Sequence, residues 1–496
     1  MKRRFILAID EGTTGITVVL LDHQARVVKK SYSEFRQYYP RPGWVEHDAE
    51  EIWSTTRTLI RQIVRRPNEV AAIGITNQRE TVVVWNRRTG KPIHRAIVWQ
   101  CRRTAPMCER LRQEGVEPSV RRATGLLLDA YFSATKIRWL LDHVPGARAA
   151  CRRGDLLCGT MDTWLIWKLT EGAVHATDPT NASRTLLYHL DRREWDPTML
   201  KMFGVPRNML PKVVKSTGDF WVATIPELRG VPIRGVAGDQ QAALFGQGCF
   251  QRGTMKNTYG TGCFLLMNTG PTRINSKNGL LTTLVCGPRG EAVYALEGSV
   301  FIGGAVVQWL RDGLKIISRA SETEGLARDI DSTGGVYMVP AFVGLGAPYW
   351  KMEARGALLG LTRGTGRKEV VRAALESMAY QTRDLVEVME RETHLKVRAL
   401  KVDGGATANN FLMQFQADIL GANIVRPKNI ESTSLGAGFL AGLGSGFWSS
   451  ADEVGRLLHT DRIFVPKMSV QQRKGFYAGW QRAVGAVSLH AGGMLH

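Results

Sequence analysis

The stretch "FILAIDEGTTGITVVLLD" (residues 5–22) places an acid and two hydroxyl groups at a tight turn between two apolar runs. The two runs predict strands, and the Gly-Thr-Thr sequence between them predicts the turn. Backbone N–H groups and the hydroxyls of Thr13 and Thr14 meet at such a turn, which suits the oxygens of a phosphate. Asp10, directly before the turn, is placed to hold a magnesium ion. The alternative is a plain β-hairpin whose hydroxyls only cap its own backbone.

The same pattern returns half a chain later. "KNTYGTGCFLLMNTG" (256–270) again has two β-rich runs around a Gly-Thr-Gly turn, and Thr261 lies half of the 496 residues beyond Thr13. A repeat at this spacing predicts two related domains that face each other across a cleft. A chain of this length also exceeds what one compact core holds. We therefore expect a first domain at residues 1–247 and a second at 248–496.

Strand-like and helix-like patterns alternate along the chain, which predicts α/β layers with helices over sheets. Near the N-terminus, apolar residues at helical spacing alternate with β-rich runs bounded by Gly, Asn and Gln. The predicted strands are 5–10, 16–22, 25–33, 70–76 and 80–86, and the predicted helix is 50–64.

Composition excludes several classes of protein. No apolar stretch approaches the roughly 20 residues of a membrane helix, and the basic start is not followed by a signal-peptide pattern, so a cytoplasmic protein without membrane insertion is expected. The formal net charge is +21, but the arginine pairs are scattered, which favours a cationic surface over a nucleic-acid site. Seven cysteines without a Cys-x-x-Cys pair favour reduced thiols over a metal site.

A third glycine-rich turn strengthens the nucleotide hypothesis. "VDGGATANN" (402–410) follows a β-rich run and precedes a predicted helix, and an acid with paired glycines at such a junction suits an adenosine-phosphate contact. No Gly-x-x-x-x-Gly-Lys-Ser/Thr loop is present, so a P-loop enzyme is excluded.

Three further residues are candidates for handling a second substrate. Arg79 and Glu80 stand side by side in "NQRET", where a donor fork and a carboxylate together suit the hydroxyls of a polyol; the alternative is a surface ion pair. Asp239 follows an apolar run at a predicted helix start. It either caps that helix or accepts a hydroxyl proton during phosphoryl transfer.

Longer motifs identify a family. "YFSATKIRWLLDH" (131–143) and "GALLGLTRGTGRKEVVRAALE" (356–376) match two signatures of the FGGY carbohydrate kinases, and the chain resembles that family over roughly residues 4–482. "TNQRET" (76–81) and "VWQCRRT" (98–104) are similar to the members that phosphorylate glycerol rather than xylulose or gluconate. The resemblance implies two ribonuclease-H-like domains of the actin and Hsp70 type around an ATP cleft.

The resemblance also implies roles for individual residues. Glycerol would be converted to sn-glycerol 3-phosphate in glycerol catabolism, with Asp239 as general base and with Asp10 and Asp239 near Mg²⁺. The glycerol-binding residues would be Arg79, Glu80, Trp99, Tyr131, Asp239, Gln240 and Phe264. The ATP-binding residues would be Thr13, Thr14, Gly260, Thr261, Gly304, Gln308, Gly405 and Asn409. The family further implies a homodimer or homotetramer.

The chain departs from the family pattern at three places. Thr17 stands where the pattern has an arginine, and the loss of such a phosphate contact removes roughly 1.5–3 kcal/mol. Either another cation replaces it, or the enzyme is slower, or the chain has become a kinase for another polyol or sugar or a weakly active nucleotide-binding sensor. Lys351 stands where an acid is common, and 224–235 lacks the glycine-rich loop with which some bacterial members bind fructose 1,6-bisphosphate.

Overall fold

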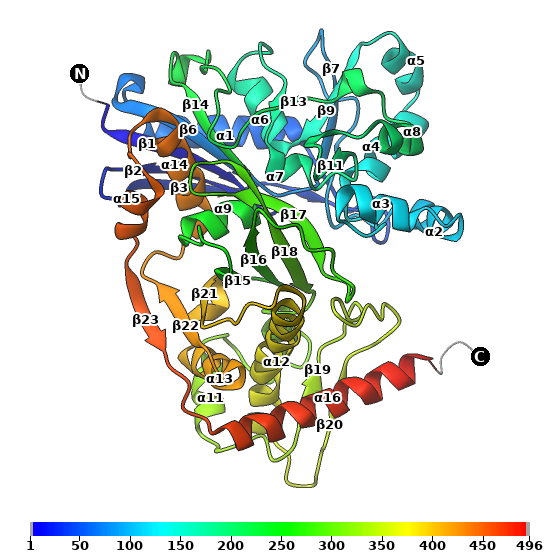
Figure 1. The fold of residues 1–496 in the computed structure, drawn as a ribbon, viewed down its shortest axis with the longest axis vertical. Coiled ribbons are helices and arrows are strands. Elements are labelled where there is room, and N and C mark those ends of the chain that lie inside the picture. Colours follow the sequence, from blue (N-terminus) through cyan, green and yellow to red (C-terminus); the bar gives the residue numbers. More distant parts are fainter. Residues whose placement is uncertain (1–2, 493–496) are drawn as a thin grey trace.

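The chain forms two lobes, each built around its own β-sheet, in a computed structural model that describes residues 3–492 (Figure 1). The outermost ends of the two expected domains, 1–2 and 493–496, lie outside the described residues. The first half of the chain forms the upper lobe in Figure 1, and most of the second half forms the lower lobe.

The first lobe contains a five-stranded sheet in the order β14-β6-β1-β2-β3. Its strands are β1 (Phe5–Glu11), β2 (Gly15–Leu21), β3 (Val27–Glu34), β6 (Val70–Asn77) and β14 (Ile233–Gly238). Strands β1, β2 and β3 form an antiparallel meander, whereas β1, β6 and β14 run parallel. The strands predicted at 5–10, 16–22 and 70–76 are confirmed within one residue. The third begins at Val27, because Asp22 binds the backbone N–H groups of a turn before it.

The second lobe contains a seven-stranded sheet in the order β17-β18-β16-β15-β21-β22-β23. Its strands are β15 (Met255–Tyr259), β16 (Cys263–Gly270), β17 (Leu281–Cys286), β18 (Ala292–Val300), β21 (Ala399–Asp403), β22 (Asn423–Pro427) and β23 (Thr460–Phe464). Here β15 pairs antiparallel with β16 and parallel with β21, as β1 pairs with β2 and β6. The strand–turn–strand predicted for 256–270 is therefore confirmed.

Helices pack around these two sheets, and the first lobe also contains a third sheet that shares a core with the first. The third sheet consists of β4 (Gln37–Tyr38), β5 (Glu46–His47), β8 (Ala96–Ile97), β7 (Val82–Asn86) and β9 (Leu156–Thr160). The helices of the first half are α1 (Ala49–Ile63), α2 (Ala105–Gln113), α3 (Glu117–Thr124), α4 (Ser133–His143), α5 (Ala147–Arg152), α6 (Met161–Leu169), α7 (Pro179–Ala182), α8 (Pro197–Phe203) and α9 (Asp239–Gly246). The helices of the second half are α10 (Ala305–Asp312), α11 (Glu322–Arg328), α12 (Arg367–Thr393), α13 (Asn410–Leu420), α14 (Ser432–Ser445), α15 (Ala451–Arg456) and α16 (Val470–Gly492).

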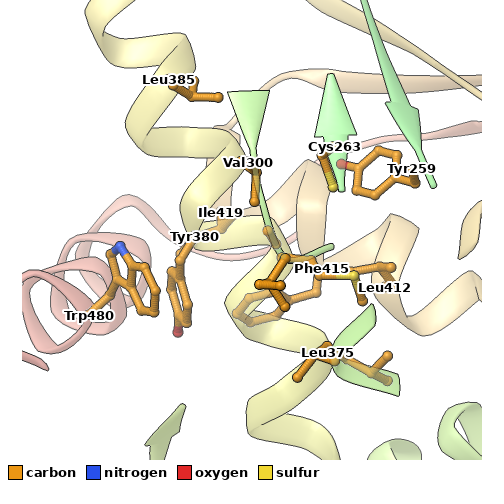
Figure 2. Close-up of a cluster of buried hydrophobic side chains, with 14 of the residues drawn as sticks. Tyr259, Cys263, Val300, Leu375, Tyr380, Leu385, Leu412, Phe415, Ile419 and Trp480 are labelled. Atoms are coloured by element: carbon orange, nitrogen blue, oxygen red, sulfur yellow. The ribbon is translucent and has the colours of Figure 1, made fainter. Parts of the chain in front are cut away.

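The core of the second lobe lies around α12, the longest helix. Tyr380 of α12 stacks on Trp480 of α16, with ring centroids 5.4 Å apart, and lies edge-on to Phe415 of α13 (Figure 2). The buried carboxylate of Asp384 accepts hydrogen bonds from Tyr477 and Trp480, which attaches the last helix to this core. Burial raises the pKa of Asp384 to about 7.

The two lobes share structure at their junction. Helix α14, which comes late in the chain, packs on the first sheet, where Phe439 and Leu440 join a core with Ala8 and Val19. Strands β17 and β18 reach from the second sheet into the core of the first lobe. The junction is thus formed by segments from both halves of the chain.

Other features agree with a reduced, folded chain. All seven cysteines are free and buried, including Cys249. Among the described helices none is both long and apolar enough to cross a membrane. Lys351 is exposed and pairs its backbone with Leu345, and nothing in the structure explains its departure from the family pattern.

Candidate active site

The first glycine-threonine turn lies at the end of β1, next to an aromatic side chain that follows β8 in the chain. The hydroxyl of Thr13 accepts a hydrogen bond of 2.9 Å from the indole N–H of Trp99, and Thr14 beside it is exposed. Asp10 is half-buried directly before this turn. The turn therefore presents one hydroxyl that Trp99 holds in place and one that is exposed.

Asp10 and Asp239 lie close enough for their charges to interact. Burial and the negative charge of Asp239 raise the pKa of Asp10 to about 7, while a hydrogen bond of 3.1 Å from Ser434 opposes that rise. Mg²⁺ in proteins is bound by one or two carboxylates together with substrate phosphates. Two neighbouring carboxylates that repel one another are therefore a suitable pair of ligands for it. The residues present thus fit the expected metal.

Asp239 is the first residue of α9, directly after β14, and the residue that caps the helix is Gly238. The alternative of Asp239 as the N-cap is therefore wrong. Its carboxylate accepts a hydrogen bond of 2.7 Å from the backbone N–H of Gln240 and lies 3.2 Å from Nε of Arg79. Its side chain is 29% exposed, so an oxygen remains accessible to a substrate.

Arg79 and Glu80 are buried, with 3% and 1% of their surfaces exposed, so the alternative of a surface ion pair is wrong. The guanidinium of Arg79 donates to both carboxylate oxygens of Glu297, at 2.7 and 3.0 Å. It also donates to the hydroxyl of Tyr131 at 3.3 Å. The fork is held in one orientation by partners from both halves of the chain.

Glu80 has one carboxylate oxygen in use and one without a partner. Its Oε1 accepts a hydrogen bond of 2.6 Å from Nε of Arg184, whereas Oε2 is buried and unpartnered. The backbone of Glu80 has a φ of +62°, in the left-handed region. A non-glycine residue held in this conformation costs roughly 1–3 kcal/mol of folding free energy. A buried acceptor without a donor calls for a ligand hydroxyl, because leaving it unpaired costs about 1–3 kcal/mol.

Three aromatic residues gather beside these charges. The ring of Trp99 lies edge-on to Tyr131, with centroids 5.5 Å apart, and to Phe264 of β16, at 6.4 Å. The rings come from both halves of the chain, and they place an apolar wall next to the buried donors and acceptors. Such a wall limits the size of a ligand and suits the carbon side of a small polyol.

Sequence reasoning missed several charged residues of this site. Arg184 bridges Glu80 and Glu297, and all three are fully buried. The two arginines hold the pKa of Glu297 at about 2, well below its ordinary value, although burial opposes them. Lys256 donates to the side-chain oxygen of Gln240. Lys256 begins the quoted stretch 256–270, and Arg184 lies in "TNASRT" (180–185), but no pattern marked Glu297.

The second glycine-threonine turn is tied to the start of α10. Gly303 and Gly304 donate backbone hydrogen bonds of 2.8 Å to the carbonyls of Thr261 and Gly260. A Cβ on Gly304 would lie 2.7 Å from the Gly260 oxygen, so this approach requires glycine. Gln308 lies one turn farther along α10 and is exposed.

The third turn lies beside the first strand of the second sheet. Gly404, with a φ of +90°, backs onto Tyr259 at the end of β15. Gly405 is exposed. The side chain of Asn409 caps α13 by accepting from the N–H of Leu412 and donates to Thr323, so most of its hydrogen-bonding capacity is used within the fold.

Comparison with known proteins adds to this geometry. The N-terminal domain model of the FGGY family of carbohydrate kinases matches residues 5–246, and the C-terminal domain model matches residues 255–445. The chain belongs to the FGGY family of carbohydrate kinases. The expected two-domain α/β fold is thereby confirmed, and with it the prediction of a kinase.

Relatives within the FGGY family are similar over nearly the whole chain. A glycerol kinase of Carboxydothermus hydrogenoformans is 57% identical over 491 residues, which cover 98% of each chain. A glycerol kinase of Aeromonas salmonicida is 55% identical, with 97% of each chain covered. The crystal structure of Plasmodium falciparum glycerol kinase with ADP superposes with a TM-score of 0.93 at 37% identity, covering 98% of each chain. A Lactobacillus acidophilus gluconate kinase, 20% identical with a TM-score of 0.88 and 99% of each chain covered, shares the fold.

Proposed function

We propose that this FGGY kinase transfers the γ-phosphoryl group of ATP to glycerol, forming sn-glycerol 3-phosphate and ADP. Residues 1–247 contribute most of the glycerol site and residues 248–496 most of the ATP site. The similarity to proteins named glycerol kinase, at 55–57% identity over nearly the full chain, supports this substrate over another polyol or sugar. We further propose that the enzyme serves glycerol catabolism in the cytoplasm as a homodimer or homotetramer.

The observation that carries the proposal is the buried carboxylate of Glu80. One of its oxygens is fixed by Arg184, and the other has no partner. A glycerol hydroxyl satisfies that acceptor, while Arg79 and Tyr131 supply further groups for the remaining hydroxyls. A site of this kind rejects a ligand that lacks a matching hydroxyl, because a buried polar group is then left unpaired.

The carbon side of glycerol contacts the aromatic wall, and the remaining polar contact comes from Gln240. Trp99 and Phe264 exclude water on that side and leave little room for a longer sugar. Lys256 holds the side-chain oxygen of Gln240, so its amide nitrogen is turned toward Asp239, 3.2 Å from the carboxylate. The side chain of Gln240 thus has its orientation set by two neighbours.

Asp239 acts as the general base. A glycerol hydroxyl oxygen forms a bond to the γ-phosphorus, the bond from that phosphorus to the bridging oxygen of ADP breaks, and the hydroxyl proton passes to the Asp239 carboxylate. Arg79 and the N–H of Gln240 hold that carboxylate in place.

The nucleotide lies against the three turns. Thr13, Thr14, Gly260 and Thr261 contact its phosphates, and Gly304, Gln308, Gly405 and Asn409 hold the rest of it. Asp10 and Asp239 would hold a magnesium ion, which would neutralise charge on the phosphates. Enclosure of the site by both lobes excludes water and suppresses hydrolysis of ATP.

A coupled assay of ADP release tests this proposal. The purified chain is incubated with ATP and Mg²⁺, and with glycerol, erythritol, xylulose, gluconate or no acceptor. We expect glycerol-dependent release, with kcat/KM for glycerol at least about 100-fold above each sugar. If another acceptor is turned over faster than glycerol, that acceptor is the substrate and the proposal for glycerol is wrong. Nucleotide binding without any acceptor-dependent release would instead support a sensor.

A further inference from the structure

Position 17 lies directly beside the metal and phosphate side of the site. In the antiparallel pairing of β1 with β2, Thr17 is opposite Asp10, and in the pairing of β2 with β3 it is opposite Tyr32. Directly paired residues share one face of a sheet. Asp10, Thr17 and Tyr32 therefore form a polar row on one face, and the middle of that row carries no charge.

The same face carries a lysine one row away. Lys30 pairs with Val19, and Val19 lies in the core beneath α14, so Lys30 projects on the α14 face. Lys29 pairs with Leu20 and donates to the carbonyl of Ile63 at the end of α1, so it lies on the opposite face. The side chains of Lys29 and Lys30 thus project from opposite faces of the sheet, and of the two only Lys30 lies on the face that carries Asp10.

The start of α14 links Lys30 to Asp10. The ammonium of Lys30 forms an ion pair with Glu431, which caps α14, and Ser434 in the first turn donates to the Asp10 carboxylate. The Lys30 side chain is 43% exposed. An exposed pair of this kind contributes only about 0–1 kcal/mol, so the ammonium exchanges partners easily.

Other charged groups around Asp10 are either acidic or held elsewhere. Asp239 and Glu431 add negative charge that raises its pKa, and Lys30 opposes them. Lys256 is fully buried and bonded to Gln240 and Thr258. The triphosphate of ATP adds more negative charge at this place, where transfer depends on cations that neutralise it.

We propose that Lys30 is the cation that binds the terminal phosphates of the nucleotide in this chain, exchanging Glu431 for a phosphate oxygen. The inference rests on the proposed nucleotide site and explains how that site operates with a neutral residue at position 17. It assigns Glu431 as the group that holds the ammonium beside the site until a nucleotide enters.

The first experiment measures binding of ATP and ADP, with Mg²⁺ and without glycerol, by calorimetry on the purified chain. We expect Lys30→Ala to weaken ATP binding at least about tenfold, the size of one charge-assisted contact. The matched control Lys29→Ala, which removes the same charge from the opposite face, should leave affinity within about twofold. Equal losses in the two variants would overturn the proposal, because only the general charge of the surface would then matter.

Glu431→Gln separates a phosphate ligand from a structural ion pair. If Lys30 serves the nucleotide, releasing it from Glu431 should leave ATP affinity unchanged or raise it. If the pair only attaches α14 to β3, Glu431→Gln should weaken ATP binding as much as Lys30→Ala does, and the proposal fails. A thermal melt of each variant reports whether the attachment of α14 is affected.

Thr17→Arg provides a rescue, because it places a cation directly opposite Asp10. We expect Thr17→Arg to restore most of the ATP affinity that Lys30→Ala loses and to add less to the parent, so that the two changes are non-additive. Additive effects of Thr17→Arg and Lys30→Ala on ATP affinity would show that the two side chains do not bind the same phosphate, and would overturn the proposal. Since glycerol is absent, these outcomes are independent of the acceptor: loss of glycerol turnover with intact ATP binding would instead count against the proposed reaction.

Discussion

The proposed acceptor site and the proposed nucleotide site are built from different kinds of groups. On the acceptor side, Arg79, Glu80, Arg184 and Glu297 are buried charged side chains that hold one another. On the nucleotide side, the three turns offer backbone groups and small residues, and Thr14, Gly260 and Gly405 are exposed. In the proposed reaction, fixed side chains would select a small neutral polyol, whereas backbone N–H groups would bind a large polyanion.

The free-energy cost of forming the two sites differs as well. Burying four charges is unfavourable unless each has good partners, and Glu297 has two arginines as partners. The backbone turns carry no such cost, because they remain close to water. Changes on the acceptor side are therefore expected to affect folding and chemistry together, and changes on the nucleotide side mainly affinity.

Asp239→Asn should have the largest effect. Removing the group that accepts the proton should lower kcat for glycerol by about 10³-fold, within the range for general base catalysis. ADP binding measured without Mg²⁺ should change little, because the turns proposed to hold the nucleotide are intact. Steady-state rates and calorimetry measure the two quantities. A variant that keeps a tenth or more of the parent kcat would rule out this assignment.

Glu297→Ala should come next. It leaves Arg79 and Arg184 buried without their shared carboxylate, which should lower the free energy of unfolding by about 3–5 kcal/mol. Urea unfolding at pH 7 measures this, with the exposed Glu353→Ala as a control that should stay within about 0.5 kcal/mol. A loss below 1 kcal/mol would mean that the two arginines find other partners.

The contribution of Glu297 should depend on pH with a defined sign. Its pKa in the folded chain is about 2, below its ordinary value of 4.5, so its stabilisation is present above pH 4.5 and is lost as the pH falls toward 2. The difference in unfolding free energy between the parent and Glu297→Gln should therefore shrink by about 1.4 kcal/mol from pH 6 to pH 3.5. Urea titrations at the two pH values test this, and a constant difference would refute the ionised state of Glu297.

The smallest effects are expected at glycines of the nucleotide side. Gly304→Ala brings a Cβ to 2.7 Å from the Gly260 carbonyl, so it should cost about 1 kcal/mol of stability and raise KM for ATP. Gly405→Ala meets nothing within 4 Å and should leave stability unchanged, with any effect confined to ADP affinity. Melting temperatures and ADP titrations of the pair compare them. Equal destabilisation would contradict the different packing of the two glycines.

Much of the site was predictable because its residues lie next to strong local signals. The turn after Asp10 and the turn at Thr261 interrupt β-rich runs, and both strand–turn–strand units formed as expected. Asp239 follows a strand and begins a helix. Such positions are read from periodicity and turn chemistry alone, without knowledge of distant contacts.

The partners of these residues were not predictable in the same way. Glu297 lies in the middle of β18 and looks like a polar residue on a strand, yet it binds Arg79, 218 positions earlier in the chain. Likewise, nothing near Lys30 in the sequence points to Glu431, 401 positions later. These contacts depend on how α14 and the strands β17 and β18 cross between the lobes.

The sequence by itself determined the α/β class, the two strand–turn–strand units, the acidic and hydroxyl residues of the first turn and the similarity to a carbohydrate kinase family. Those properties follow from local spacing, because side-chain periodicity and turn chemistry act over a few residues. Only the tertiary structure decided that Arg79 and Glu80 are buried, that one oxygen of Glu80 has no partner, and that Lys30 pairs with Glu431 on the face of the sheet that carries Asp10. Burial and long-range ion pairing arise when distant segments pack together, and their free energies exist only once that packing has formed.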